Sequence, residues 1–377
     1  MPGKHIMKSI GEILDENDGV GRGFDFLRIG LALAVVAIHS VQVCYGPEAP
    51  GLVARGMVGP FLASVLPMFF GLSGFLVMGS SFRTRNVATF LTFRALRLIP
   101  ALAVEVTLSA LILGTVLTTL PLAEYFSDIR LLAYFGNIIG RVRFELPGVF
   151  DDLPASGMVN ANLWTLHAEL FCYFLMTAAM LTRVAYNRVA VTAVWGAMAI
   201  FMTGYGVYSH AFELHGGAFK SSVLVFSFVS GVVAYHWRHS IPASNWIALI
   251  SVPLAFGLLK LPYTAFAVHL PIIYLTLWIG SKPLLSLGGD YSYGVYLYSY
   301  PIQQTLVSLS PSLREWWVIF PLATIMSVLI ASLSWTYIER PALQLKRLIV
   351  RRQPKSQRVS PVLAPGGSDL DGLSKPL

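Results

Sequence analysis

Charged side chains are scarce in this 377-residue chain, where Asp, Glu, Lys and Arg make up only 12% of the sequence. Soluble globular proteins carry about twice that fraction. Hydrophobic residues reach 55% and the mean hydropathy is +0.65. Apolar runs of about twenty residues, the length that crosses a bilayer as a helix, recur along the chain. The composition therefore excludes a soluble domain and predicts an all-α polytopic membrane protein.

Cysteine is nearly absent, with Cys44 and Cys172 as the only two. Both fall within apolar runs, and their spacing fits neither a metal site nor a disulfide framework. We therefore expect two small buried core residues and no bound metal.

The first 23 residues also lack the basic start and apolar core of a cleavable signal peptide, and they contain Asp15 and Glu16. We interpret residues 1–23 as a cytoplasmic segment. Ile10 and Leu14, spaced as on one helical face, predict a short interfacial helix within it.

The net charge of +8 is not gathered into a compact basic face, which argues against a nucleic-acid partner. Lys and Arg lie instead between the apolar runs and toward the C-terminus. With a cytoplasmic N-terminus, the inner segments hold 19 of them and the outer segments seven. This excess predicts that both termini are cytoplasmic.

The apolar runs predict about ten transmembrane helices in a domain covering residues 24–345. We place the spans near 24–44, 58–79, 98–119, 162–181, 189–206, 219–237, 244–259, 263–280, 291–309 and 316–337. The apolar segment 129–140 is too short to span and is expected to be a re-entrant or packed helix. Residues 353–377, rich in Pro, Gly and Ser, are expected to form a disordered cytoplasmic tail, with no soluble catalytic domain appended.

Ionisable residues inside membrane spans are costly, so they are the first functional candidates. In the first span, Arg28 and His39 are eleven residues apart, which puts them on one helix face about 16 Å apart along the axis. Asp25, one turn before Arg28, is placed to pair with it. A single buried histidine is more often a packed core residue than a catalyst, so the interpretation of His39 depends on its neighbours.

Arg94 and Arg97 lie one helical turn apart at the predicted inner end of the third span. With Arg28 at a similar depth, they would form a three-arginine cluster, and the guanidinium fork suits bidentate phosphate binding. Ordinary membrane-anchoring arginines are the alternative for this pair. Glu105, further along the same span, is expected to pair with one of these arginines.

The fourth span carries Glu169 at a depth similar to that of His39, with Asn162 as the expected N-cap. A carboxylate beside an imidazole would hold its tautomer and stabilise the imidazolium, making His39 a competent general base. His167 lies two residues from Glu169, roughly on the opposite helix face, and is interpreted as structural.

The second span contains Ser73 within the run Phe-Phe-Gly-Leu-Ser-Gly-Phe at 69–75. Small residues in this run allow a helix or a ligand to approach closely. Ser73 is not in a nucleophile-elbow setting. We therefore expect it to pack or to hydrogen-bond a ligand rather than to form an acyl-enzyme.

Taken together, these motifs resemble those of the membrane-bound family 3 acyltransferases. The resemblance covers about residues 22–345. It is carried by Arg28-x10-His39, the run at 69–75, Arg94-x-x-Arg97, Leu-Pro-Gly-Val-Phe at 146–150, Asn-Leu-Trp-Thr-Leu-x-x-Glu at 162–169 and Tyr-Ile-Glu-Arg-Pro at 337–341.

The resemblance implies a ten-helix enzyme of the bacterial inner membrane that moves acyl groups, usually acetyl from acetyl-CoA, to hydroxyls of envelope sugars. The family's essential Arg and His correspond to Arg28 and His39, and its arginine pair to Arg94 and Arg97. The expected partners are a carbohydrate or glycolipid acceptor, the lipid bilayer and envelope-glycan assembly proteins. Acetyl-CoA is expected as a donor substrate, not as a bound cofactor.

Two features depart from the family pattern. Many members have a histidine in the ninth span where this chain has Ser299, so that histidine's role does not carry over. Some members also have a C-terminal esterase-like domain. If transfer requires such a domain here, we expect another protein to supply it.

We therefore expect Arg28, Arg94, Arg97 and Ser73 to bind the donor, and His39 with Glu169 to catalyse transfer. The loop 141–161 is a candidate acceptor-side surface, with a solvated polar loop as the equal alternative. The rival function is a transporter of an envelope glycan or its precursor, in which the buried charges would form a substrate or proton path. A non-catalytic scaffold in an envelope-glycan complex is a third interpretation.

Overall fold

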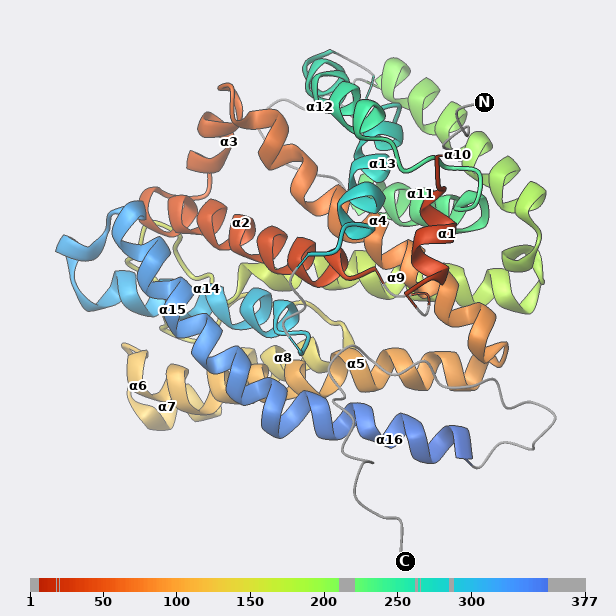
Figure 1. Cartoon of the computed structure of the whole chain (residues 1–377). Coiled ribbons are helices and arrows are strands. Elements are labelled where there is room, and N and C mark those ends of the chain that lie inside the picture. Colours follow the sequence, from red (N-terminus) through yellow and green to blue (C-terminus); the bar gives the residue numbers. More distant parts are fainter. Residues whose placement is uncertain are drawn as a thin grey trace, which may run out of the picture.

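The computed structural model of the chain describes residues 7–17, 19, 21–209, 221–261, 264, 266–284 and 288–351. All regular secondary structure in these ranges is helical, apart from one isolated β-bridge between Ser9 and Pro242. The all-α prediction is therefore confirmed for the described part of the chain (Figure 1).

Each predicted span coincides with a helix of the structure. These helices are α2 (Gly23–Tyr45), α4 (Gly59–Thr84), α5 (Val87–Leu108), α9 (Trp164–Leu181), α10 (Arg188–Ser209), α11 (Ser221–Trp237), α12 (Asn245–Lys260), α13 (His269–Gly280), α14 (Ser292–Leu309) and α15 (Trp316–Ser334). Six helical stretches are long and apolar enough to cross a membrane: α2, α4, α5 with its extension to Leu117, α9 with the turn before it, α10, and α15 with its extension. The apolar helices α11, α12 and α13 are shorter.

Two predicted boundaries differ most from the ends of the helices. Helix α5 begins at Val87, well before residue 98, because the Asn86 side chain caps it by accepting from the Thr89 amide at 2.9 Å. At the other end of the domain, α15 runs through a π-helical turn, η6 (Trp335–Glu339), into α16 (Arg340–Arg351). The predicted boundary at 345 therefore falls inside a helix. The predicted tail at 353–377 lies outside the described residues.

Helix α1 (Ile10–Asp15) forms where a short interfacial helix was predicted, and Ser9 and Glu12 close it with a capping box. Its apolar face does not lie free for the membrane, because Ile10 and Leu14 are buried. The Ile10 amide also bonds the Ile241 carbonyl at 2.8 Å, which ties α1 to the α11–α12 connection.

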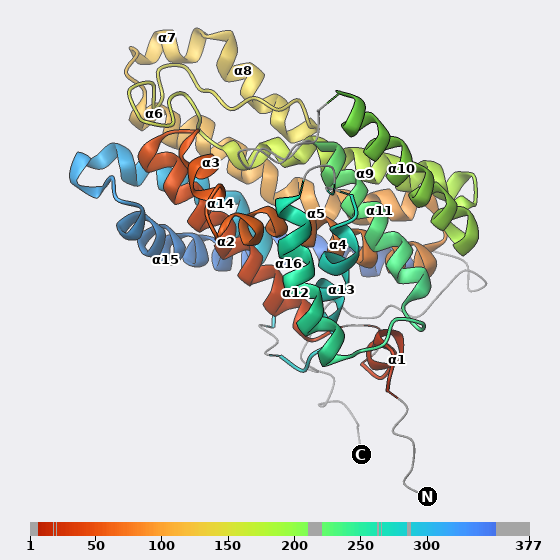
Figure 2. The same ribbon diagram turned by 90° about the horizontal axis from the view of Figure 1, so that it is seen from above.

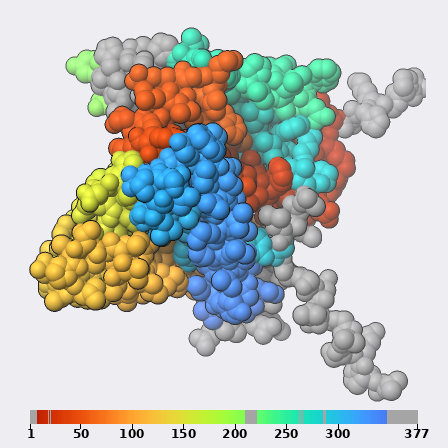
Figure 3. Space-filling view, turned by 90° about the vertical axis from the view of Figure 1, so that its left-hand side faces the viewer, coloured from red at the N-terminus to blue at the C-terminus, as the bar shows by residue number. Residues whose placement is uncertain are grey.

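Several short helices gather at one end of the bundle: α3 (Ala49–Ala54), α6 (Gly114–Leu117), α7 (Leu122–Ser127) and α8 (Ile129–Phe135). Figure 3 looks onto this end, which also includes the turn between α14 and α15, whereas α1 and α16 lie toward the opposite end (Figure 1). The apolar segment 129–140 forms helix α8 and the 3-10 turn η2 (Gly136–Ile139). They pack onto α5, which fits the packed-helix alternative.

Among the described residues, the most extensive contact between two helices is that of α4 with α11, which lie side by side near the middle of the molecule (Figure 2). Gly71, Gly74 and Gly231 make this approach possible. A Cβ added to Gly74 would lie 1.9 Å from the carbonyl oxygen of Phe228, and one added to Gly231 would lie 1.9 Å from the carbonyl oxygen of Gly71. The prediction that small residues near Ser73 allow close helix packing is therefore confirmed.

The outward faces of the bundle carry large exposed apolar side chains. Ile200 on α10, Leu249 on α12 and Leu329 on α15 are each at least 60% exposed. Many other large apolar side chains of the described helices are exposed in the same way, which suits contact with lipid. The chain is a multi-pass membrane protein.

Candidate functional site

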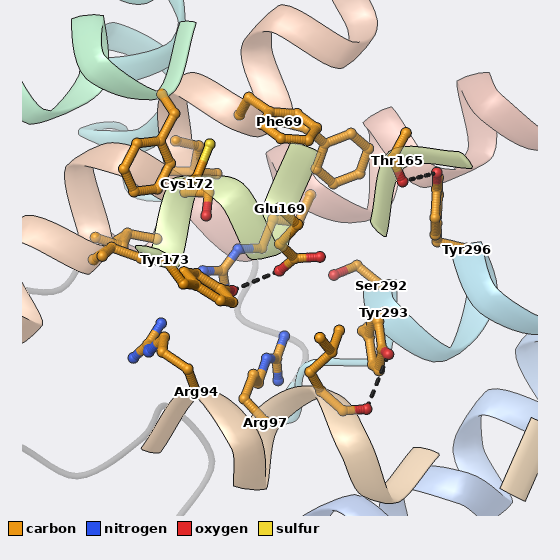
Figure 4. A pocket seen from close by; sticks show the side chains of 18 of the residues that line it. Phe69, Arg94, Arg97, Thr165, Glu169, Cys172, Tyr173, Ser292, Tyr293 and Tyr296 are labelled. Atoms are coloured by element: carbon orange, nitrogen blue, oxygen red, sulfur yellow. Dashed lines mark hydrogen bonds between the residues drawn. The ribbon is translucent and has the colours of Figure 1, made fainter. Parts of the chain in front are cut away.

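A cavity of about 180 Å³ opens among α2, α4, α5, α9, α11 and α14. Five of the six side chains predicted for the site line it: Arg28, Ser73, Arg94, Arg97 and Glu169. The sixth, His39, is not among the lining residues. The rest of the wall is largely aromatic and aliphatic, with Cys172, Tyr173, Ser292 and Tyr296 among the polar or polarisable groups (Figure 4).

Arg94 and Arg97 project from consecutive turns of α5 toward Glu169 and Tyr173 on α9 (Figure 4). The Arg94 guanidinium donates to the Ser80 hydroxyl at 3.4 Å. Within the described part of the chain, its Nε has no hydrogen-bond partner. Both arginines line the cavity, and a guanidinium group can donate two parallel hydrogen bonds to a phosphate.

Asp290, which sequence reasoning missed, joins two of the three arginines. Its Oδ2 accepts hydrogen bonds from Arg28 Nη1 at 2.9 Å and from Arg97 Nη2, and its Oδ1 accepts from the Ser292 hydroxyl at 2.6 Å. The expected Asp25–Arg28 pair is present but longer, at 3.9 Å. Asp290 precedes α14 in a connecting segment, where no helical spacing could indicate which residues it would meet.

The pKa of Asp290 shows that the arginines outweigh burial. Burial alone would raise that pKa, but the positive charges of Arg97 and Arg28 hold it well below its usual range. The carboxylate is therefore ionised at neutral pH and balances part of the arginine charge.

Replacing Asp290 with asparagine should lower the stability of the fold by about 2 kcal/mol at neutral pH. Because the pKa is lower in the folded state, ionised Asp290 stabilises the fold above about pH 4 and that stabilisation is lost as the pH falls further. The difference in Tm between wild type and variant, measured in detergent from pH 7 to pH 3, should therefore narrow at the acid end. Glu16→Gln, which breaks the exposed Lys8–Glu16 pair, serves as the control and should show no such pH-dependent difference.

Glu169 was predicted to orient His39, and the structure corrects this. The Glu169 carboxylate accepts from the Tyr173 hydroxyl at 2.5 Å, one turn further along α9, and faces the arginine side of the cavity. His39 Nδ1 instead lies 2.9 Å from Gln42 Oε1. Similar depth did not imply contact, since depth leaves the rotation of each helix about its axis undetermined.

His39 is half-buried on α2, three turns beyond Arg28. Its ring meets the Tyr300 ring edge-on, with centroids 5.1 Å apart and planes at 81°. Gln42 and Met158 complete this group, which lies toward the α3 end of α2. Sequence spacing therefore predicted the separation of Arg28 and His39 along the helix, while the partners of His39 were missed.

Glu105 was wrongly expected to pair with an arginine. It is almost fully buried and its Oε1 accepts from Asn160 Nδ2 at 2.9 Å and from the Ser109 hydroxyl at 2.8 Å. Two helical turns separate Glu105 from Arg97, which puts it beyond reach of the arginine cluster. It links α5 to the segment before α9.

Asn160, not Asn162, caps the start of the fourth span, because its side chain accepts from the Asn162 amide at 3.1 Å. Asn162 Nδ2 donates instead to the Ser299 hydroxyl at 3.3 Å, and Ser299 is fully buried. Ser299 thus holds α14 against this segment.

His167 is exposed on the face of α9 opposite the cavity, in agreement with its structural interpretation.

The loop 141–161 is folded onto the bundle. Its own residues Leu146 and Val149 are buried, and the Asn137 side chain hydrogen-bonds the backbone of Arg143. Asp151 and Asp152 stay exposed.

Cys44 and Cys172 are buried free thiols, as expected of separate core residues. Within the ranges described, no group of three or more His, Cys, Asp or Glu side chains is placed to hold a metal ion.

The sequence model of a family described as the acyltransferase domain matches residues 22–336, most of the chain and every helix around the cavity. The chain belongs to the membrane-bound family 3 acyltransferases. As a member, it is an enzyme that transfers acyl groups other than aminoacyl groups.

Two curated relatives of this acyltransferase cover nearly its whole length. It is 26% identical to "Nodulation protein 10" of Rhizobium leguminosarum bv. viciae, over 91% of this chain and 99% of the relative. It is 25% identical to the "O-acetyl transferase" of Shigella phage Sf6, over 88% of this chain and 97% of the relative. No solved structure is detectably similar.

Proposed function

We propose that this acyltransferase moves an acyl group, in the first instance acetyl, from acyl-CoA to a hydroxyl of a cell-envelope or exported carbohydrate. The observation that carries the proposal is the cavity in which Arg28, Arg94 and Arg97 from two helices converge. The name of the phage relative, an O-acetyl transferase, supports the choice of acyl group and acceptor atom.

In this proposal the three arginines bind the phosphates of CoA. Arg94 and Arg97 point into the cavity, and guanidinium groups suit phosphate oxygens because they donate two parallel hydrogen bonds (Figure 4). Ser73 lies on the same wall and is assigned a hydrogen bond to the donor. The apolar and aromatic remainder of the wall suits the less polar arm that carries the thioester.

His39 acts as the general base in the proposed reaction. Its imidazole takes the proton from the acceptor hydroxyl, whose oxygen attacks the thioester carbonyl. The carbon–sulfur bond then breaks, the acyl group stays on the acceptor oxygen, and the CoA sulfur leaves with the proton returned by the imidazolium. Glu169 is assigned to the donor side, where it faces the arginines, and not to the orientation of His39.

We further propose that all ten predicted spans cross the bacterial inner membrane, with both ends of the chain in the cytoplasm. The excess of Lys and Arg on the predicted inner segments supports this orientation. So does the position of α1 and α16 toward the same end of the bundle (Figure 1). The arginine cluster would then face the cytosolic donor, and His39 would face an acceptor, with envelope-glycan assembly proteins as partners.

The test is turnover of isotope-labelled acetyl-CoA by purified protein in proteoliposomes supplied with envelope glycolipids. Arg94→Gln should raise KM for acetyl-CoA about 10–100-fold, since a hydrogen bond to a charged group contributes about 1.5–3 kcal/mol. Arg130→Gln, which changes an exposed side chain of α8, is the matched control and should leave KM unchanged. Wild-type protein that neither binds nor consumes acetyl-CoA, in the presence of these lipids, would overturn the proposal.

A further inference from the structure

The hydrogen bond of His39 defines which of its ring nitrogens carries the proton. His39 Nδ1 lies 2.9 Å from the side-chain oxygen of Gln42, one turn further along α2. An amide oxygen only accepts hydrogen bonds, so Nδ1 must be the donor in this contact. The lone pair of the neutral ring is then on Nε2.

The neighbours of Gln42 favour this orientation of its amide group over the flipped one. Gln42 Nε2 points at the sulfur of Met158, at 3.9 Å, and the Tyr300 hydroxyl donates to the same sulfur at 3.8 Å. A thioether sulfur is an acceptor and has no proton to give. It therefore suits the amide NH₂ and leaves the amide oxygen for His39.

We infer that Gln42 is a positioning residue that holds His39 in the Nδ1–H tautomer with Nε2 as the proton-accepting atom. This inference rests on the proposed role of His39 as general base. Tyr300 adds a second constraint, because its ring meets the imidazole edge-on and restricts rotation of the ring plane. Gln42 and Tyr300, from α2 and α14, together fix both the protonation pattern and the orientation of the base.

A neutral amide in this position has a specific consequence. In the Ser-His-Asp arrangement, a carboxylate both fixes the tautomer and stabilises the imidazolium by its charge. Gln42 does the first and not the second. The imidazolium is therefore formed without a paired anion from Gln42, which favours prompt return of the proton to the departing sulfur.

The direct test is ¹⁵N NMR of histidine-labelled protein in lipid at a pH where His39 is neutral. The wild type should show His39 with Nδ1 protonated, and Gln42→Leu should show exchange between both tautomers. Gln42→Glu, which keeps an oxygen acceptor, should retain the wild-type tautomer. An Nε2–H tautomer in the wild type would overturn the inference whether or not the protein transfers acetyl groups.

Kinetics provide the second readout. Gln42→Leu should lower kcat about 10–100-fold, by analogy with the loss of the partner that orients a metal-bound histidine, with KM for acetyl-CoA unchanged. Gln42→Glu should restore most of kcat. Ser40 is two residues from Gln42, and its hydroxyl accepts a hydrogen bond from Gln303. Ser40→Ala removes that bond, leaves the His39–Gln42 contact intact and should keep wild-type kcat. Full kcat in Gln42→Leu would contradict the inference, whereas absence of turnover in the wild type would contradict the proposed function.

Discussion

Replacing His39 with alanine should slow acyl transfer by about 10²–10⁴-fold, the range expected for loss of a general base, without weakening acetyl-CoA binding. The separation of the two effects follows from the structure. His39 does not line the cavity that holds the arginines, and it lies three turns of α2 away from Arg28. The variant should therefore bind the donor and fail to use it.

Two measurements on the same preparation separate these effects: calorimetric titration with CoA gives the Kd, and single-turnover transfer gives the rate. His167→Ala is the control, because His167 is exposed on the far face of α9. Equal losses in binding and rate would place His39 in the donor site. Wild-type transfer by the folded variant would exclude it from the chemistry.

Replacing Gly74 with valine should destabilise the fold by about 3 kcal/mol or more, the upper end of the cost of overpacking. The first added atom would lie 1.9 Å from the Phe228 carbonyl oxygen and 2.8 Å from its carbon. Backbone cannot move aside as a side chain can, so α11 would have to shift away from α4. Phe70, Ser73 and Phe228 line the cavity at this contact, so acetyl-CoA binding should fall as well.

The matched control for this substitution is Gly196→Val on α10. A Cβ at Gly196 meets nothing within 4 Å, so the helix should tolerate the larger residue. Thermal unfolding in detergent compares the two variants with the wild type. A Gly74→Val protein with wild-type Tm would mean that α4 and α11 are further apart than the structure places them.

The helices of this protein were predictable because apolar length is a strong signal in a bilayer. The two predicted boundaries that differ most from the helix ends have local causes. At α5, the polar and charged residues before the apolar run are held in the helix by the Asn86 cap. At α15, the helix continues past the apolar run through η6 into α16.

The meeting of five predicted site residues at one cavity was largely predictable: Arg28, Arg94, Arg97, Ser73 and Glu169. Charged residues buried in spans must face the bundle interior, which favours such a meeting, although Glu105 faces the interior elsewhere. The partners were less predictable. Asp290 comes from a connecting segment without periodicity. Gln42 lies three residues after His39, the spacing of side chains that meet on one helix face, so the sequence does indicate it as a partner of His39.

The Asp290 carboxylate between Arg28 and Arg97 has a consequence for turnover in the proposed reaction. A CoA phosphate that binds there would compete with the Asp290 carboxylate for Arg28 and Arg97, because those guanidinium groups already have an anionic partner. The net gain is the difference between two sets of ion pairs, which is far smaller than either set alone. The same carboxylate is ready to reoccupy the arginines when spent CoA departs. In the proposed reaction, donor binding would therefore stay reversible, and the Asp290 carboxylate would compete with the product for the arginines.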